Sequence, residues 1–412
     1  MEEDFTKNFI DVFLEHSYNN HLFAFMSLHL ILGRCLWKVK IPKKRLWLDG
    51  RISFWYLAPP SSGKSTPYDF ISEILTSLEN NEGIHDVDDA SDAVLIGYDN
   101  EDGDRVKGIL DRGGVVHWDE AAMLLGTTQY AEKTKAFLQK CLNPVGSGTN
   151  TCTREFKNTV VSIDPYCSLY LTSYIPDKIL EVVLGTGMLQ RLLCVPKDVT
   201  TEDRKKNAYT DIDYLGTVSG GEDLGVEYFI ERFKKINDKY NKEDTVFDWS
   251  EVKPFFKGKS DNILNISKDS PNRVRKLMET FHPRYMDSMY ILSMHHCCLR
   301  NDNIINSDDV EYAYRIISGC YTAILAWLED EPTFNQSKKK DQEYFKNVKT
   351  LFKNEKKIGS TTFFKKCCKM WNISEPIARK RVLALVERAK QGEEGLRKEK
   401  TGRAVFFRLQ KR

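Results

Sequence analysis

The sequence predicts an α/β fold in which a core of strands and helices leads into a helical region and then a small basic domain. Three apolar segments, 52–57, 114–118 and 168–172, have the length and composition of buried strands, and polar residues follow each of them. Apolar residues recur at helical spacing through much of 225–329. A polar linker then sets residues 341–412 apart, and we expect them to fold as a separate unit.

The composition excludes several classes of protein. The chain of 412 residues is 41% hydrophobic and 11% aromatic, so it can bury a sizeable core and is neither disordered nor fibrous. Its longest apolar run, 22–33, contains His29 and is expected to be a core helix rather than a membrane span. The acidic start shows no signal peptide. The ten cysteines form no C-x-x-C pair, which favours a reducing bacterial, archaeal or host-cell cytoplasm.

The near-neutral net charge of +2 conceals an asymmetry. Residues 337–412 hold 23 Lys and Arg but only 8 Asp and Glu, a net charge of +15, and the remainder of the chain carries −13. A basic tail on an acidic body indicates that the tail meets a polyanion. The alternative is a solvated, lysine-rich surface.

The first part of the chain combines helices with a hairpin. Residues 1–45 are expected to be helical, because Phe5, Phe9 and Phe13 recur at helical spacing. The dipeptide Asp49-Gly50 lies between two apolar runs and predicts a hairpin turn.

Further elements are predicted along the chain. Ser307 is expected to be the N-cap of the last helix before the linker, with Asp308 and Asp309 in its first turn. The remaining expectations are helices at 67–80 and 130–142, a hairpin at 94–112 with a polar tip, a helix near 120–126 and alternating strands at 151–163.

A candidate phosphate-binding loop follows the segment 52–57 and precedes a helical pattern. A P-loop requires this order of strand, loop and helix, because loop amides and the positive helix end face the phosphates. Lys64 would reach the β- and γ-phosphates of ATP, and Ser65 would hold Mg²⁺. Ala58 stands where the usual motif has glycine. The candidate nucleotide-binding residues are Ala58, Pro59, Pro60, Ser61, Ser62, Gly63, Lys64, Ser65 and Thr66.

Two carboxylates follow the apolar segment 114–118, about 55 residues after the loop. In P-loop ATPases such a strand places its aspartate near the metal, and an adjacent glutamate can polarise the attacking water. We therefore expect Asp119 to bind Mg²⁺ and Glu120 to act as the general base. His117 alternates with Trp118 along the strand and is expected to be a core residue rather than a ligand.

The two motifs together resemble those of the minichromosome maintenance (MCM) helicases, which are hexameric AAA+ DNA helicases. Residues 109–120 resemble their Walker B segment, and 58–65 resemble their Walker A loop, which also has proline at its third position. The resemblance covers roughly residues 50–330 and implies an AAA+ core that hydrolyses ATP with Mg²⁺. The chain departs from the family at the sensor-1 position, which is asparagine in the family, because the corresponding strand here ends in Thr172-Ser173. Either hydroxyl could orient water.

The resemblance extends to two arginines. Residues 187–193 resemble the arginine-finger segment of the family, 282–286 its sensor-2 helix, and 306–311 the start of its last lid helix. Because the family's active site lies between subunits, the resemblance implies that Arg191 and Arg284 act on a neighbour's nucleotide. An arginine there stabilises charge in the transition state. The alternative for each arginine is a surface salt bridge.

The resemblance also implies two hairpins that point into a central channel and contact single-stranded DNA. One interrupts the helix after Walker A, and residues 94–110 fit it; the other precedes sensor 1, and 151–158 fit it. Basic hairpin residues can hold successive phosphates. The candidates are Arg154 and Lys157, followed by Arg105 and Lys107.

The basic tail predicts three helices and a β-hairpin. Ser360 and Ser374 are candidate caps of its second and third helices, and Thr401-Gly402 is the candidate turn of the hairpin. This pattern is a winged helix, whose third helix would enter the major groove of duplex DNA while the wing touches phosphate. A protein-binding winged helix is the alternative. The candidate DNA contacts are Arg379, Lys380, Arg381, Arg388, Lys398, Lys400 and Arg403.

The sequence thus predicts an ATP-driven, ring-forming DNA helicase or translocase for replication, of a shortened MCM-like type. Two alternatives remain, a DNA-binding AAA+ initiator, loader or regulator that remodels a partner, and a DNA packaging or transposition ATPase. The expected assembly is a homo-oligomer, a hexamer by resemblance, with no contact to a membrane. The expected parts are a helical N-terminal segment (1–45), an AAA+ core (46–215), a helical lid (216–330), a linker (331–340) and a winged helix (341–412).

Overall fold

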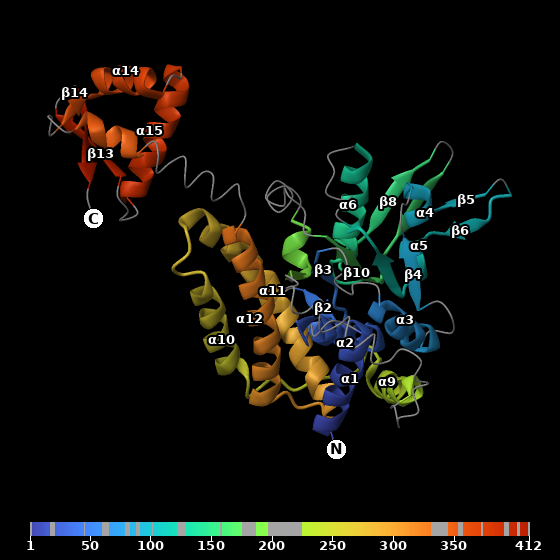
Figure 1. The fold of residues 1–412 in the computed structure, drawn as a ribbon. Coiled ribbons are helices and arrows are strands. Elements are labelled where there is room, and N and C mark those ends of the chain that lie inside the picture. Colours follow the sequence, from blue (N-terminus) through green and yellow to red (C-terminus); the bar gives the residue numbers. More distant parts are fainter. Residues whose placement is uncertain are drawn as a thin grey trace, which may run out of the picture. The chain divides into compact units, whose positions relative to one another are not determined.

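The computed structural model shows two compact units, residues 1–327 and 328–412, and each is described by itself (Figure 1). The structure describes residues 2–16, 21–44, 46–59, 66–78, 83–87, 91–100, 102–121, 129–156, 159–174, 187–196, 225–330, 345–352, 357–371, 374–390, 395–401 and 404–410. Among these residues, no helix combines the length and the apolar character that crossing a membrane requires.

A five-stranded parallel sheet forms the centre of the first unit, with the order β11-β3-β10-β7-β4. Every residue of β3, β7 and β10 is buried, as expected for parallel strands covered on both faces. The predicted strands at 52–57, 114–118 and 168–172 are therefore confirmed. The strands are β3 (Phe54–Leu57), β4 (Ile84–Val87), β7 (Val115–Trp118), β10 (Ser168–Ser173) and β11 (Leu193–Pro196).

Aromatic residues join the helices to one face of this sheet. The rings of Phe23 and Tyr56 stack with centroids 4.0 Å apart, and Phe13 meets Phe23 edge-on at 5.1 Å. Phe9 on α1 (Glu2–His16) packs against Phe229 on α9 (Val226–Tyr240), which brings these two helices together. The helices concerned are α1 (Glu2–His16), α2 (His21–Cys35), α3 (Thr66–Leu78) and α9 (Val226–Tyr240). The core helix predicted over 22–33 and the helix predicted over 67–80 are confirmed.

The hairpin turn predicted at Asp49-Gly50 is wrong. Strand β2 (Trp47–Asp49) pairs antiparallel with β1 (Lys40–Pro42), so part of the stretch expected to be wholly helical is a strand. Asp49 instead accepts hydrogen bonds from Arg51 Nε and Nη2, both at 2.9 Å, inside the core. This buried ion pair lies where the chain passes from β2 to β3.

The insertion between β4 and β7 contains a shorter hairpin than the sequence predicts. Strands β5 (Gly97–Asp99) and β6 (Arg105–Lys107) pair antiparallel, but the flanking residues form the short helices α4 (Asp92–Ile96) and α5 (Ile109–Arg112). Gly97 has φ of 89°, and a Cβ there would lie 2.2 Å from Val106 O. Figure 1 shows this hairpin projecting away from the sheet.

A second hairpin is confirmed in the segment predicted to alternate. Strand β8 (Cys152–Glu155) pairs antiparallel with β9 (Val160–Ile163) immediately before β10. Helix α6 (Gln129–Cys141) precedes it and confirms the helix predicted over 130–142. The helix expected near 120–126 falls mostly outside the described residues.

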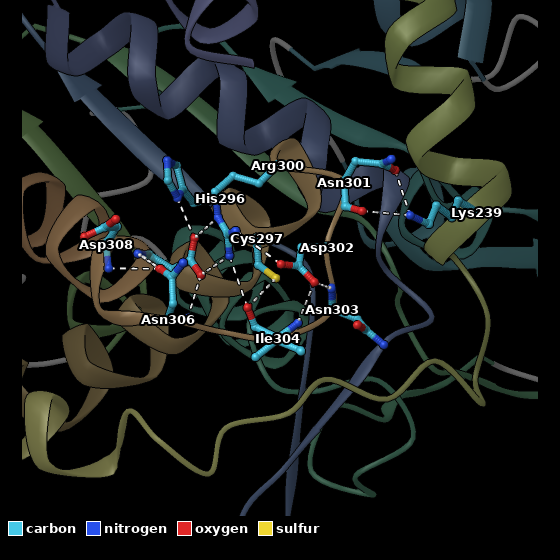
Figure 2. Close-up of polar contacts among 11 residues, drawn as sticks. Lys239, His296, Cys297, Arg300, Asn301, Asp302, Asn303, Ile304, Asn306 and Asp308 are labelled. Atoms are coloured by element: carbon cyan, nitrogen blue, oxygen red, sulfur yellow. Dashed lines mark hydrogen bonds and ion pairs between the residues drawn. The ribbon is translucent and has the colours of Figure 1, made fainter. Parts of the chain in front are cut away.

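Helices α10 (Lys253–Ile266), α11 (Asn272–Leu299) and α12 (Ser307–Asp330) complete the first unit and confirm the predicted helical region. The side chain of Asn306 accepts from the backbone N–H groups of Asp308 and Asp309, so Asn306, not the predicted Ser307, caps α12 (Figure 2). Asp309 is fully buried and accepts from Arg300 Nη2 at 2.8 Å and pairs with His296 Nδ1 at 2.6 Å.

A chain of buried hydrogen bonds joins α2, α11 and α12. His295 Nε2 lies 2.7 Å from Gly50 O, and a carbonyl only accepts, so this nitrogen carries the proton. His295 Nδ1 must then accept from His29 Nδ1 at 3.1 Å, and His29 Nε2 accepts from Tyr312 Oη at 3.0 Å. Burial lowers the pKa of His295 to about 4. One placement of the protons on these side chains therefore satisfies every donor and acceptor in this series of hydrogen bonds.

These buried hydrogen bonds predict that the first unit loses stability as the pH falls. In the unfolded protein, His295 becomes protonated below about pH 6.5, whereas in the native protein it stays neutral down to about pH 4. The free energy of unfolding therefore falls as the pH is lowered through this range. The loss should reach about 3 kcal/mol. His295→Gln keeps one donor and one acceptor but cannot titrate, so urea unfolding between pH 7 and 4.5 should show a smaller loss. Equal losses in both proteins would contradict the assignment.

The described residues of the second unit form three helical segments and a three-stranded sheet. The helical segments are residues 345–351, α14 (Ser360–Trp371) and α15 (Glu375–Lys390). The sheet has the order β12-β14-β13, with β12 (Ile358–Gly359), β13 (Gly395–Thr401) and β14 (Ala404–Gln410). The predicted hairpin is confirmed by the pairing of Thr401 with Ala404, and β12 was not predicted. Phe363, Val382 and Phe407 lie in its hydrophobic core.

Candidate ATP site and nucleic-acid contacts

The strand order brings the start of the candidate loop and the two carboxylates to one edge of the sheet. Strand β10 lies between β3, which leads into the candidate loop, and β7, which leads into the two carboxylates. The carboxyl ends of β3 and β10 are joined by Ala58 N, which donates to Ser173 O at 3.0 Å. In open parallel sheets, ligands bind at this carboxyl edge. Pro59 is the last described residue of the loop, and residues 60–65, with Lys64 and Ser65, lie outside the described residues.

A hydroxyl and a carboxylate meet at the centre of this edge. Thr172 Oγ1 donates to Asp119 Oδ1 at 2.5 Å, and Asp119 Oδ1 also accepts from Glu120 N at 2.9 Å. Thr172 is buried, Asp119 is partly buried and Glu120 is exposed. Glu120 has φ of 48°, a conformation that is uncommon for residues other than glycine. The chain therefore turns sharply as it leaves β7, between the carboxylate held by Thr172 and the one that faces solvent.

The second candidate hydroxyl has a different environment. Ser173 Oγ accepts from Trp55 Nε1 at 3.0 Å and donates to Tyr174 O at 3.0 Å. Successive residues of a strand point to opposite faces of the sheet, so Ser173 points away from the face on which Thr172 meets Asp119. Of the two hydroxyls that the sequence left open, Thr172 is the one in contact with the candidate metal ligand.

Sequence reasoning missed a cluster of polar side chains on the same face. Asp86 on β4 accepts from Tyr68 Oη at 2.5 Å and pairs with His117 Nδ1 at 2.7 Å. The ring of His117 lies 4.7 Å from that of Tyr170. His117 is therefore a core residue, as predicted, but one that links α3, β4 and β7. No local sequence signal joins residues this far apart along the chain.

The oxygen atoms at this edge fit a magnesium ion. Mg²⁺ prefers carboxylate and hydroxyl oxygens and is usually bound through one or two carboxylates together with substrate phosphates. Asp119 and the hydroxyl of Thr172 supply such atoms at the end of β7 and β10. In the described part of the chain, this edge included, no group of three or more His, Cys, Asp or Glu side chains could hold a metal ion.

The two predicted arginines line one pocket. Arg191 ends a short 3-10 helix (Leu189–Arg191), and its Nη1 donates to Gly187 O at 2.8 Å. Arg284 on α11 lies 3.9 Å from Asp287. Burial and then the nearby Arg284 lower the pKa of Arg191. The pocket is also lined by Asp49, Arg51, Ser53, Asn143 and Ser288.

This pocket lies at the opposite edge of the sheet from Asp119. Arg191 precedes β11, and residues 48–53 precede β3, so both lie at the amino ends of parallel strands. Thr172 and Asp119 lie at the carboxyl ends. Four residues of strand span roughly 13 Å. Arg191 and the carboxylates of one chain are therefore on different edges, and among described residues Arg191 contacts no carboxylate.

The hairpin arginines are engaged within the chain. Arg154 Nη1 pairs with Asp92 Oδ2 at 2.5 Å, and its guanidinium lies 4.6 Å from the ring of Phe156. Arg105 Nη2 donates to Ile96 O at 2.7 Å. Lys107 is exposed, and Lys157 lies outside the described residues.

The tail residues are placed only in part. Lys398 and Lys400 are exposed on β13. Arg379 on α15 donates to Glu375 at 2.6 Å through Nη2 and lies over the ring of Phe364 at 4.5 Å, so its charge is partly used within the unit. Arg403 lies outside the described residues. The side chains of three other candidates on α15 also lie outside the described part of the chain, namely Lys380, Arg381 and Arg388.

Comparison with protein-family models gives no match to this chain, and comparison with curated proteins gives none either.

Proposed function

We propose that the chain is an ATP-driven, ring-forming DNA helicase or translocase of MCM-like type, with an AAA+ core and a C-terminal winged helix. The observation that carries the proposal is the contact between Thr172 and Asp119 on adjacent strands β10 and β7, beside the end of β3. The sequence places a Gly-Lys-Ser loop directly after β3 and Glu120 directly after Asp119. These are the parts that a P-loop ATPase requires.

Each residue has a chemical role in this proposal. The ammonium of Lys64 binds the β- and γ-phosphates, and Ser65 and Asp119 hold Mg²⁺, which neutralises charge on those phosphates when bound. Thr172 orients the Asp119 carboxylate through its hydrogen bond. Glu120, exposed beside that carboxylate, accepts a proton from the attacking water as general base.

The positions of these residues at the two edges of the sheet support a proposed arrangement of subunits in a ring. Arg191 and Arg284 line a pocket at the amino edge together with Asp49, Arg51 and Asp287, and in this proposal no phosphate of the same chain's nucleotide lies there. A neighbouring subunit that presents its carboxyl edge to this pocket would bring its γ-phosphate to both arginines. The arginines would then stabilise the charge that develops during hydrolysis.

DNA contacts divide between the two units. The described residues of the second unit combine three helical segments with a β-hairpin, and its segment 337–412 carries a net charge of +15, as a winged helix that binds duplex DNA does. The hairpins β5–β6 and β8–β9 are the candidate contacts to a single strand. Lys107 and Lys157 are the basic side chains on them that remain as phosphate contacts.

Unwinding of a forked DNA duplex in the presence of ATP and Mg²⁺ tests this proposal. The wild-type chain is expected to unwind the fork, and Lys64→Ala is expected to lose ATP binding, hydrolysis and unwinding together, because the charge that faces the phosphates is gone. Lys346→Ala, in the other unit, is a matched loss of one lysine and should retain all three activities. ATP hydrolysis without unwinding would instead favour a loader or regulator, and ATP binding by Lys64→Ala at wild-type affinity would contradict the P-loop assignment.

A further inference from the structure

Among the described residues, an ion pair joins helix α4, which precedes the β5–β6 hairpin, to the β8–β9 hairpin. Asp92 is the first residue of α4, which leads into β5, and Arg154 is the third residue of β8. Arg154 Nη1 lies 2.5 Å from Asp92 Oδ2, and α4 also contacts β9. The pair therefore connects the insertion between β4 and β7 with the hairpin that precedes β10.

The two partners differ in burial. The side chain of Asp92 is 7% exposed, and its Oδ1 has no hydrogen-bond partner among the described residues, whereas the side chain of Arg154 is 30% exposed. Leaving a buried carboxylate without its cation is strongly destabilising. A DNA phosphate at the surface would have to draw Arg154 away from Asp92 and leave that carboxylate uncompensated. Arg154 is therefore better placed to hold Asp92 than to bind a phosphate.

The backbone at the base of the insertion is closely packed, so α4 and the β5–β6 hairpin move together. A Cβ at Gly108 would lie 2.3 Å from Gly97 N, and the backbone N–H of Gly97 donates to Ala93 O of α4. Arg105 of β6 also donates to Ile96 O at the end of α4. A force on α4 through Asp92 is thus passed to β5 and β6 by short backbone contacts.

We propose that Asp92 and Arg154 form a latch that holds the β8–β9 hairpin against α4, so that the two hairpins act as one mechanical unit. Asp92 is a positioning residue for both hairpins, and Arg154, predicted from the sequence as a DNA contact, serves the latch instead. The latch itself depends only on the described geometry. Its consequence for DNA rests on the proposed function.

Amide hydrogen exchange of the full chain, without DNA, tests the latch directly. Arg154→Gln should accelerate exchange about tenfold or more in both hairpins, because the buried Asp92 charge is left unpaired. Asp92→Asn/Arg154→Gln removes that charge, and its two side-chain amides can still hydrogen-bond to each other, so it should restore much of the protection in both hairpins. Glu155→Gln changes an exposed carboxylate on the same strand and should leave exchange unchanged. Acceleration confined to β8–β9, or no restoration in the double variant, would overturn the latch.

Binding of a single-stranded oligonucleotide separates a latch from a phosphate contact. If Arg154 serves the latch, the double variant Asp92→Asn/Arg154→Gln should keep the wild-type affinity and the wild-type dependence on salt. If Arg154 binds a phosphate, the double variant should lose affinity, and the slope of log K against log salt should fall by about 0.7. A chain that bound no DNA would count against the proposed function, and hydrogen exchange would still decide the latch.

Discussion

Glu120→Gln and Arg191→Ala are each expected to abolish most ATP hydrolysis, and an equal mixture of the two variants is expected to recover part of it. The carboxamide of Glu120→Gln cannot accept the water's proton, and loss of a general base lowers turnover about 10²–10⁴-fold. Arg191→Ala removes a cation from the transition state, and such a loss lowers turnover about 10³–10⁵-fold. ATP binding by Glu120→Gln should be normal, because the phosphate contacts remain.

The recovery follows from the positions of the two residues. Arg191 and the carboxylates lie at opposite edges of the sheet, so one active site would draw Glu120 from one chain and Arg191 from its neighbour. Random mixing places an intact pair at about one interface in four, and about a quarter of the wild-type hydrolysis should return. Steady-state ATPase assays after confirmed subunit exchange measure this recovery.

The controls distinguish a site between subunits from other outcomes. Arg315→Ala removes an arginine that is 78% exposed and pairs with Glu311 on its own helix, and it should hydrolyse ATP normally. Normal turnover by Glu120→Gln would refute its role as general base. Mixed proteins that stay as inactive as the separate variants would count against an active site shared by neighbouring chains.

Removal of residues 331–412 is expected to weaken binding to duplex DNA by about 10²-fold or more and to flatten its dependence on salt. The segment 337–412 carries a net charge of +15, and the remaining body is acidic. Each phosphate that the tail neutralises releases counterions, so its removal should reduce the slope of log K against log salt by about 0.9 per contact. Titrations of a labelled duplex at several salt concentrations measure both effects.

The truncated chain provides its own control. Its 330 residues contain the whole of the first compact unit, 1–327, and every residue assigned to the nucleotide site, so it should still hydrolyse ATP. Lys157→Ala in the full chain should affect a different step. It should leave duplex binding by the tail intact, unlike the truncation, and should reduce unwinding. Unchanged duplex affinity and salt slope after truncation would identify the second unit as a protein-binding module.

Local patterns in the sequence were sufficient for most elements. Strands β3, β7 and β10 were predicted because they are continuous apolar runs whose length and flanking polar residues are local features. Strands β4 and β11 of the same sheet were not predicted. The Asp49-Gly50 turn failed because the same dipeptide can serve a hairpin or a buried ion pair. Which of the two occurs depends on Arg51 and on Val145 N, which lies far away in the sequence and donates to Asp49 Oδ2.

The candidate site was predictable in its parts but not in its contacts. The loop, the carboxylate pair and the two arginines carry recognisable residue types at recognisable spacing. That Thr172, not Ser173, meets Asp119 depends on which face of β10 lies beside the end of β7, a matter of strand order. That Arg154 pairs with Asp92 depends on the packing of α4 against the second hairpin.

The sequence by itself determined the α/β pattern of the core, the separation of a basic tail and the chemistry of the residues that precede and follow β3 and β7. These features depend on composition, period and spacing, which act over a few residues. Only the tertiary structure decided that β10 lies between β3 and β7, that Arg191 lies at the far edge from Asp119, and that Arg154 is held by Asp92. Each of these depends on contacts between residues distant in the chain, whose energies are set by burial and by the pairing of buried charges rather than by local preference.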